Sequence, residues 1–429
     1  MSSPIPEHPS SGARAGWQHA VRALRHRAYR RFFLAQSASL IGTWVQLVGV
    51  SWLVWRLTHD AAWLGWTGFA AQIPILLIAP FAGVWSDRFD RRRLLLVTQA
   101  LSLLQSLGLA LLVLTGTVEA WHCLVLAGLL GCINAFDTPV RQSFTVAMVA
   151  DRADLPSAIA LNSFMFNLAR LLGPSVAGFL ISAFGEAACF LLNGASYVGV
   201  LSVLATLRLP PPPRRAASGS VVTALLEGAR FAWHHALIGP LLFQLMLVSA
   251  LIAPYVQLMP IFAGQVFGGD ARTLGLLIGA AGAGAVGATV MLATRPGIHG
   301  LPRVIGRGGL LAGLGLAGFA QSTVLPLSMT LMVAVGFGII STAASVNTLI
   351  QSRVPDDKRG RIMSLYTISF LGLSPLGSLT LGHLSAAFGA PRVLAVAGLL
   401  CALGSLRFLL RASALTRTLV QTGAQKELD

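Results

Sequence analysis

The sequence has 429 residues, of which 55% are hydrophobic and only 11% are charged, and its mean hydropathy is +0.73. This is more apolar surface than a water-soluble fold can bury, so the composition excludes a soluble globular protein and indicates membrane helices. The net charge of +16 is compatible with nucleic-acid binding, but the basic residues lie between apolar runs and do not share one polar face. We therefore expect a lipid bilayer as the partner, and no nucleic acid.

The amino-terminal segment, residues 1–31, is polar and rich in arginine. The apolar run that follows is too long for a signal-peptide core and lacks a small-residue cleavage site, so we expect this segment to be retained on the cytoplasmic side. Apolar Trp17, Val21 and Leu24 alternate there with arginines. The pattern fits a short interfacial helix or a disordered basic tail.

Twelve apolar runs approach the roughly 20 residues that a helix needs to cross a membrane. In the first half they cover residues 32–57, 63–85, 94–115, 123–149, 157–184 and 187–207. In the second half they cover residues 240–266, 274–292, 304–320, 327–350, 362–388 and 393–410. We expect an all-α membrane protein of about 12 transmembrane helices in two six-helix bundles, residues 32–207 and 240–410.

The segment between the halves, residues 208–239, begins with prolines and arginines and is too polar to span, so we expect a cytoplasmic linker. If the amino terminus is cytoplasmic, most of the 31 basic residues fall on the cytoplasmic side, as the positive-inside rule requires. Both termini then lie in the cytoplasm of a bacterial cell, with residues 411–429 as a cytoplasmic tail.

The two halves share internal repeats. Leu40-Ile41-x-x-Trp44-Val45-Gln46-Leu47 recurs as Leu251-Ile252-x-x-Tyr255-Val256-Gln257-Leu258, and Gly178 with Ser182-Ala183-Phe184-Gly185 recurs as Gly382 with Ala386-Ala387-Phe388-Gly389. The offsets are nearly equal and fall in corresponding spans, which indicates duplication of a six-helix unit.

The loop after the second span reads Gly83-Val-Trp-Ser-Asp87-Arg88-Phe-Asp90-Arg91-Arg92-Arg93 and resembles the signature of the major facilitator superfamily. The sequence departs from that signature in having Asp90 where glycine is usual. The resemblance implies a conformational latch made of Gly83, Asp87, Arg88, Arg91 and Arg92. In such a latch, Asp87 contacts the amino-terminal end of the eleventh helix and holds the outward-facing state.

A narrower resemblance rests on the segments around residues 134–142, 162–174 and 355–364, and is to the subgroup of siderophore exporters and macrolide efflux proteins. It implies a secondary active transporter that works by alternating access and exports a small amphipathic molecule in exchange for protons. Import, or lipid or lysolipid flipping, are the alternatives with the same fold. Gly173-Pro174, followed by Gly178, resembles the exporter signature and predicts a helix bend.

Three ionisable residues lie within the predicted spans at depth, where charge is costly: Asp137, Arg141 and Arg170. Asp137 and Arg141 are four residues apart, hence on one helix face. We expect the three to form one buried network that either responds to protons or acts as a static ion pair between helices.

Uncharged polar and aromatic residues are predicted to line a central cavity, although each alone also fits interhelical packing. The set is Gln36, Gln46, Asn134, Gln244, Gln257, Asn347, Gln351, Trp44 and Tyr255. The sequence contains neither a His-Glu-x-x-His motif nor a glycine-rich lysine loop for ATP, so we expect neither an enzyme nor an ATP-driven pump. We also expect no cofactor and no metal, and a monomer that binds protons and a small-molecule substrate.

Overall fold

The computed structural model describes residues 22–86, 90–149, 151–207, 230, 235, 237–295, 297–298, 300–354 and 356–426. Most of the predicted linker, the first 21 residues, and Asp87 and Arg88 of the predicted latch therefore lie outside the described residues. No strand occurs in the described part of the chain.

Helices account for nearly all of the described residues. In the first half they are η1 (Arg22–Arg25), α2 (Arg27–Thr58), α3 (Ala61–Ser86), α4 (Arg91–Leu114), α5 (Ala120–Ala147), η2 (Arg152–Asp154), α6 (Leu155–Phe184) and α7 (Glu186–Thr206). In the second half they are α9 (Ile238–Leu251), α10 (Tyr255–Ile261), η3 (Phe262–Val266), α11 (Ala271–Ala293), α12 (Leu301–Gln321), α13 (Leu325–Arg353), α14 (Asp356–Thr367), η4 (Ile368–Gly372), α15 (Leu373–Phe388) and α16 (Ala390–Lys426).

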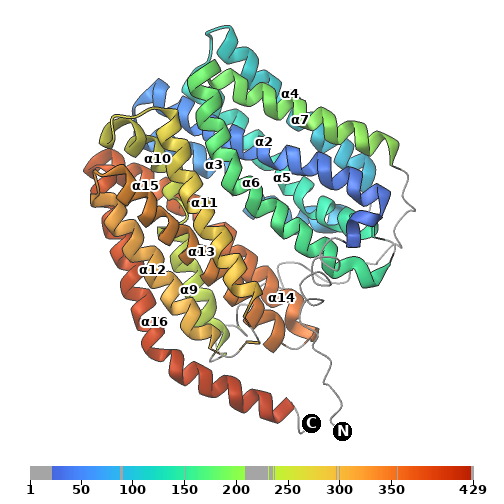
Figure 1. Cartoon of the computed structure of the whole chain (residues 1–429), viewed down its shortest axis with the longest axis vertical. Coiled ribbons are helices and arrows are strands. Elements are labelled where there is room, and N and C mark those ends of the chain that lie inside the picture. Colours follow the sequence, from blue (N-terminus) through green and yellow to red (C-terminus); the bar gives the residue numbers. More distant parts are fainter. Residues whose placement is uncertain are drawn as a thin grey trace, which may run out of the picture.

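The described residues contain 12 helical stretches that are long and apolar enough to cross a membrane. They form two bundles, α2–α7 and α9–α16, which Figure 1 shows side by side in blue to green and in yellow to red. The fold class expected from the sequence is therefore confirmed. The residue boundaries of the two domains and of the linker stay predictions.

Two spans are not the uninterrupted helices that the apolar runs suggested. The seventh breaks at Ala253-Pro254 between α9 and α10 and ends in the π-helical turn η3, and the eleventh contains the π-helical turn η4 between α14 and α15. Pro254 has no backbone N–H to continue the helix, which accounts for the first break. After the break, α10 begins at Tyr255, which is one of the predicted cavity residues.

The bundles make close backbone contacts along two seams. In the first, a Cβ on Gly275 of α11 would lie 2.5 Å from the Pro174 oxygen of α6, and one on Gly178 would lie 2.6 Å from the Ala271 oxygen. In Figure 1, α6 and α11 lie side by side at their upper ends and separate toward their lower ends. These positions have no room for a side chain, so the bundles touch through their backbones.

The second seam joins α3 and α15 in the same way. A Cβ on Gly65 would lie 2.7 Å from the Ser378 oxygen, and one on Gly382 would lie 3.0 Å from the Ala61 oxygen. Gly65 and Ala61 lie in the first turns of α3, and Gly382 lies near the end of α15. Both seams are therefore at the end of the molecule that carries the loops after α2, α10–η3 and α15, which we call the closed end.

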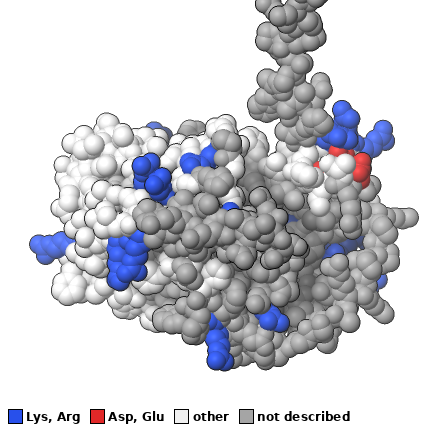
Figure 2. All heavy atoms as spheres, turned by 90° about the horizontal axis from the view of Figure 1, so that it is seen from below, with Lys and Arg blue, Asp and Glu red and all other residues white. Residues whose placement is uncertain are grey.

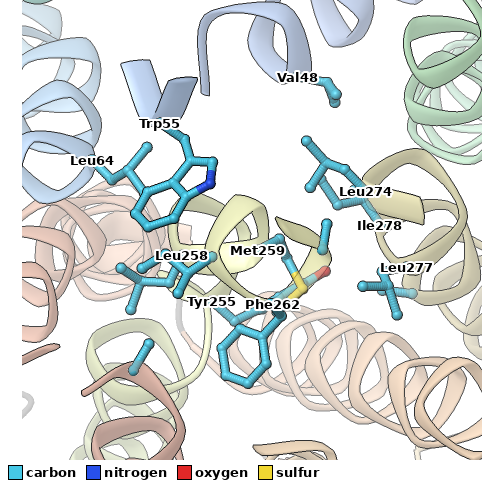
Figure 3. Packing of buried hydrophobic residues seen from close by; sticks show 14 of the residues in the cluster. Val48, Trp55, Leu64, Tyr255, Leu258, Met259, Phe262, Leu274, Leu277 and Ile278 are labelled. Carbon is cyan, nitrogen blue, oxygen red and sulfur yellow. The ribbon is translucent and has the colours of Figure 1, made fainter. Parts of the chain in front are cut away.

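Apolar side chains fill the space between the seams. Figure 3 shows Trp55 and Leu64 of the first bundle near Leu258 of the second, and Val48 near Leu274, all within one buried cluster. The Trp55 indole nitrogen would lie 3.0 Å from a Cβ on Gly264, so the ring lies directly on the second bundle's backbone. This packing excludes water from the closed end.

At the opposite end, the amino-terminal segment docks on the first bundle. Arg22 and His26 both contact the buried carboxylate of Asp154 at 3.0 Å, and the Ser157 hydroxyl accepts a hydrogen bond from the Ala23 backbone N–H. The first long helix thus begins at Arg27, earlier than predicted, and the predicted carboxyl-terminal tail is helical as far as Lys426.

Replacing Gly382 by leucine is expected to open the closed end, because the added side chain would collide with the backbone of α3 across the seam. Spin labels at Thr117 and Thr323, in closed-end loops of the two bundles, should report a longer mean distance in Gly382→Leu. Gly199→Leu is the matched control, since nothing lies within 4 Å of a Cβ at that position. An unchanged distance in a folded Gly382→Leu variant would mean that the seam does not hold the bundles together.

Candidate functional site

Asp137 is a buried carboxylate in the middle of α5, with 4% of its surface exposed. Its Oδ1 accepts hydrogen bonds from the Thr98 hydroxyl and the Gln99 amide of α4, both at 2.8 Å. Its Oδ2 lies 3.2 Å from the Arg141 Nε, one turn along α5. The charge is therefore paired and fully hydrogen-bonded, as burial in an apolar bundle requires.

Arg170 lies apart from this pair. Its guanidinium carbon is 5.7 Å from the ring centroid of Trp44 on α2, and the group also interacts with the phenol of Tyr255 on α10. Within the described part of the chain, no ion pair joins Arg170 to Asp137. The expected network of three charges is therefore corrected to an Asp137–Arg141 pair and a separate arginine between aromatic rings.

Gln46 belongs to a hydrogen-bond network inside the first bundle and does not face a cavity. Its amide nitrogen donates to the Gln105 carbonyl at 2.8 Å, and its oxygen accepts from Ser106 and Asn193 at 2.7 Å. Only 2% of its surface is exposed. These bonds join α2, α4 and α7, so the placement predicted for Gln46 is corrected from cavity wall to bundle interior.

Two predicted cavity glutamines of the second bundle also have partners. Gln244 donates to the Ser405 hydroxyl of α16 at 2.7 Å and is buried within that bundle, which corrects its predicted cavity position. The Gln257 oxygen accepts a 3.5 Å hydrogen bond from Ser51 of α2, and its side chain fills the space beside Gly68. Gln257 therefore lies between the two bundles.

Four predicted cavity residues keep part of their surface open: Trp44 and Asn134 at mid-helix positions, and Asn347 and Gln351 in the last two turns of α13. Asn347 accepts a hydrogen bond from Gln351 one turn along α13. Gln36 is buried on α2, and its side-chain oxygen has no hydrogen-bond partner among the described residues. The partly exposed amides of Asn134, Asn347 and Gln351 are suited to contact a polar solute.

The arginine-rich loop has a structural role within the first bundle. Arg92 donates from Nε to the Leu204 oxygen at 2.7 Å and from a second nitrogen to the Ala205 oxygen at 2.6 Å, so it caps the last turn of α7. Asp90, which departs from the family signature, caps α4 by accepting from the Arg93 backbone N–H at 2.9 Å. Gly83 lies within α3, and Arg91 is half-buried in the first turn of α4.

The Gly173-Pro174 pair lies in the middle of α6, which continues to Phe184. Gly173 abuts the Trp44 side chain, and the Pro174 oxygen faces Gly275 across the seam. Both residues therefore serve close packing, on α2 and on α11 respectively. The bend predicted at this pair stays a prediction.

Sequence reasoning missed the buried polar residues of α4, of which Thr98 and Gln99 bind Asp137. Thr98, Ser102, Gln105 and Ser106 are all buried and recur at helical spacing, so they form one polar stripe facing α5, α2 and α7. This periodicity was the signal that could have located them, because a polar stripe in an otherwise apolar helix faces other helices and not lipid.

We expect Gln46→Leu to destabilise the protein by several kcal/mol, because it leaves Gln105, Ser106 and Asn193 with unmet hydrogen bonds in a dry interior; each such loss costs about 1–3 kcal/mol. The melting temperature of the purified variant tests this. Gln36→Leu is the control on the same helix, and its effect should be smaller because the Gln36 oxygen has no partner among the described residues. Equal melting temperatures for the two variants would contradict the prediction.

A protein family and several known proteins are similar to this chain in sequence. The family model described as "Transmembrane secretion effector" matches residues 19–421. The Staphyloferrin A transporter of Staphylococcus aureus (strain NCTC 8325 / PS 47) is 26% identical over 86% of this chain and 92% of its own length. The multidrug efflux pump Tap of Mycolicibacterium fortuitum is 24% identical over 81% and 87%, and the enterobactin exporter EntS of Shigella flexneri is 26% identical over 84% and 86%.

Solved structures share the fold. A bacterial homologue of the human lysosomal transporter Spinster, in an inward-facing and unoccupied conformation, has a TM-score of 0.65 at 14% identity, covering 96% of this chain and 98% of its own. The nucleoside transporter NupG has a TM-score of 0.69 at 12% identity, covering 89% and 98%. The protein is thus a multi-pass membrane transporter and not an enzyme. The chain belongs to the transmembrane secretion effector family of the major facilitator superfamily.

Proposed function

We propose that this transporter exports a small amphipathic molecule, of the siderophore or drug-like kind, across the bacterial cytoplasmic membrane in exchange for protons. The direction of transport is supported by the relatives, which are named as siderophore and multidrug exporters. The observation that carries the mechanism is the pair of glycine seams at one end of the molecule, Gly65 with Gly382 and Gly178 with Gly275. Two rigid bundles in contact at one end can rock about that contact, which is the movement that alternating access needs.

The orientation follows from charge. Arginines cluster at the end opposite the seams, and Figure 2 shows them over this face, where the acidic side chains of described residues lie at one edge. Described residues among them are Arg25, Arg27, Arg30, Arg31, Arg91, Arg92, Arg93, Arg295, Arg303, Arg353, Arg359, Arg361, Arg407 and Arg411. Because positive residues favour the cytoplasmic side, the closed end is periplasmic and the conformation is inward-facing.

Cysteine labelling in intact cells tests this orientation. A cysteine at Arg93 should react with a membrane-impermeant maleimide only after the cells are opened, whereas one at Gly268 should react in intact cells. Both positions lie in the described loops or first turns at opposite ends of the molecule. Labelling of both from the same side would invert or abolish the proposed topology.

Proton coupling is assigned to Asp137, because among the described acidic residues it alone lies buried at mid-span. Charged Asp137 balances Arg141, while protonated Asp137 leaves that arginine free to bind elsewhere. The two protonation states therefore favour different arrangements around α4 and α5, which gives protons a differential effect on the transport cycle.

We expect Asp137→Asn to exchange substrate across the membrane but not to accumulate it against a gradient, because the amide cannot release a proton. Everted vesicles with an imposed pH gradient measure this directly. The single variant also leaves Arg141 without a counter-charge, so it must be compared with Asp137→Asn/Arg141→Gln, which removes both charges. Asp270→Asn, at the closed-end cap of α11, is the control and should accumulate substrate normally.

Full proton-driven accumulation by well-expressed Asp137→Asn would leave Asp137 as a structural ion-pair partner. Restored expression of the double variant without pH dependence would support coupling. The predicted latch of Asp87 with the eleventh helix belongs to the other, outward-facing half of the cycle, when the arginine-rich ends of the bundles close. We retain that latch as part of the proposal.

A further inference from the structure

Among the described residues, no acidic side chain forms an ion pair with Arg170. Among the described residues of the spans the acidic group at depth is Asp137, and Arg141 already pairs with it at 3.2 Å. The neighbours of Arg170 are instead aromatic, Trp44 and Tyr255. An arginine at this depth is costly unless it faces water or a partner, and such residues commonly mark a transport path.

The groups around Arg170 form one surface from both bundles. Phe166 lies one turn before Arg170 on α6, is 49% exposed, and packs edge-on against Trp44 with ring centroids 6.4 Å apart. Tyr255 reaches Arg170 from the second bundle and is buried. The surface thus offers a cation and two partly exposed aromatic rings side by side, with the buried Tyr255 phenol in contact with the cation.

This surface lies directly beside a seam. A Cβ on Gly282 of α11 would lie 2.8 Å from the Arg170 oxygen, and Gly173 abuts Trp44. A solute bound to Arg170 would therefore lie next to the contact between Arg170 of the first bundle and Tyr255 of the second. Binding there can act on the equilibrium between the two conformations, because the contacts with Tyr255 change when the bundles move.

The duplicated half does not repeat the charge. The offset that relates Gly178 to Gly382 relates Arg170 to Ser374, a small residue of α15. The same duplication relates Trp44 to Tyr255, so the two aromatic residues on Arg170 occupy equivalent positions of the two halves. The site accordingly has one cation at a place where both halves contribute an aromatic residue.

We propose that the transported solute is an anion, with a carboxylate that pairs with the Arg170 guanidinium and an adjacent aromatic or flat apolar group that packs on Trp44 and Phe166. A guanidinium matches a carboxylate in two parallel hydrogen bonds. This inference deepens the proposed export function and rests on it. It excludes cationic amphipaths as preferred solutes, because their charge would repel Arg170.

Three fluorescent probes of similar shape test the preference for charge: dansylglycine is an anion, dansylamide is neutral, and N-dansylethylenediamine is a cation. Their binding to the purified protein is followed by the rise in dansyl emission. The wild-type protein should bind dansylglycine at least about tenfold more tightly than dansylamide, as expected for a charge-assisted hydrogen-bonded pair. The cation should bind most weakly.

Arg170→Gln should reduce dansylglycine affinity about tenfold or more and leave dansylamide affinity unchanged, whereas Arg170→Lys should retain part of the anion preference. Arg307→Gln, which removes an exposed arginine of α12, is the matched control and should bind all three probes as the wild type does. Melting temperatures without probe identify any variant that does not fold. The comparison of probes on wild-type protein decides the question without any variant.

Tighter binding of the cationic probe, or an anion preference that survives in folded Arg170→Gln, overturns the proposal. Loss of pH-driven transport in Arg170→Gln with an intact anion preference also overturns it and makes Arg170 a partner in proton coupling. A different result would count against the proposed export function. Anion binding through Arg170 without any transport of dansylglycine by proteoliposomes would uphold the binding site and reject transport of such anions.

Discussion

The contact between the two bundles depends on the absence of side chains at the glycines of the seams. In lipid, helices gain little from burying apolar surface, so bundles associate where their backbones can approach closely. Gly65, Gly178, Gly275 and Gly382 permit this approach at the closed end, and Gly282 extends it along α11. The rest of the arrangement follows, because the apolar filling between Trp55 and Leu274 and the position of Arg170 both require that the bundles meet there.

The seams preserve the duplication better than the polar sites do. Ala61, Gly65 and Ser378 in one seam correspond to Ala271, Gly275 and Pro174 in the other, and each carbonyl oxygen faces the equivalent glycine. Ser378 and Pro174 share only a carbonyl oxygen, which is the group that makes the contact. The close backbone contact imposes the same steric limits on both halves, whereas a solute or a proton needs only one copy of its binding site.

Sequence patterns predicted the fold well because hydropathy, the charge of the loops and the internal repeats can each be read directly from the amino-acid sequence. They predicted the neighbours of polar residues poorly. Gln46 and Gln257 occupy equivalent repeat positions, yet one is bonded within a bundle and the other lies between bundles. Helical spacing tells which face a residue occupies but not which helix covers that face. The break at Pro254 was also invisible to hydropathy, since the residues on both sides of it are apolar.

The two charged sites fit together energetically. If the solute is a monoanion that leaves the cell while one proton enters, each cycle moves the equivalent of two positive charges inward. A membrane potential of about 100 mV, negative inside, then contributes roughly 2.3 kcal/mol for each charge, before any pH gradient is counted. An uncharged solute would gain only the proton's share. Under the two proposals, Arg170 binds the kind of solute that the membrane potential helps to expel, while the Asp137–Arg141 pair, neutral overall in its charged form, carries the proton.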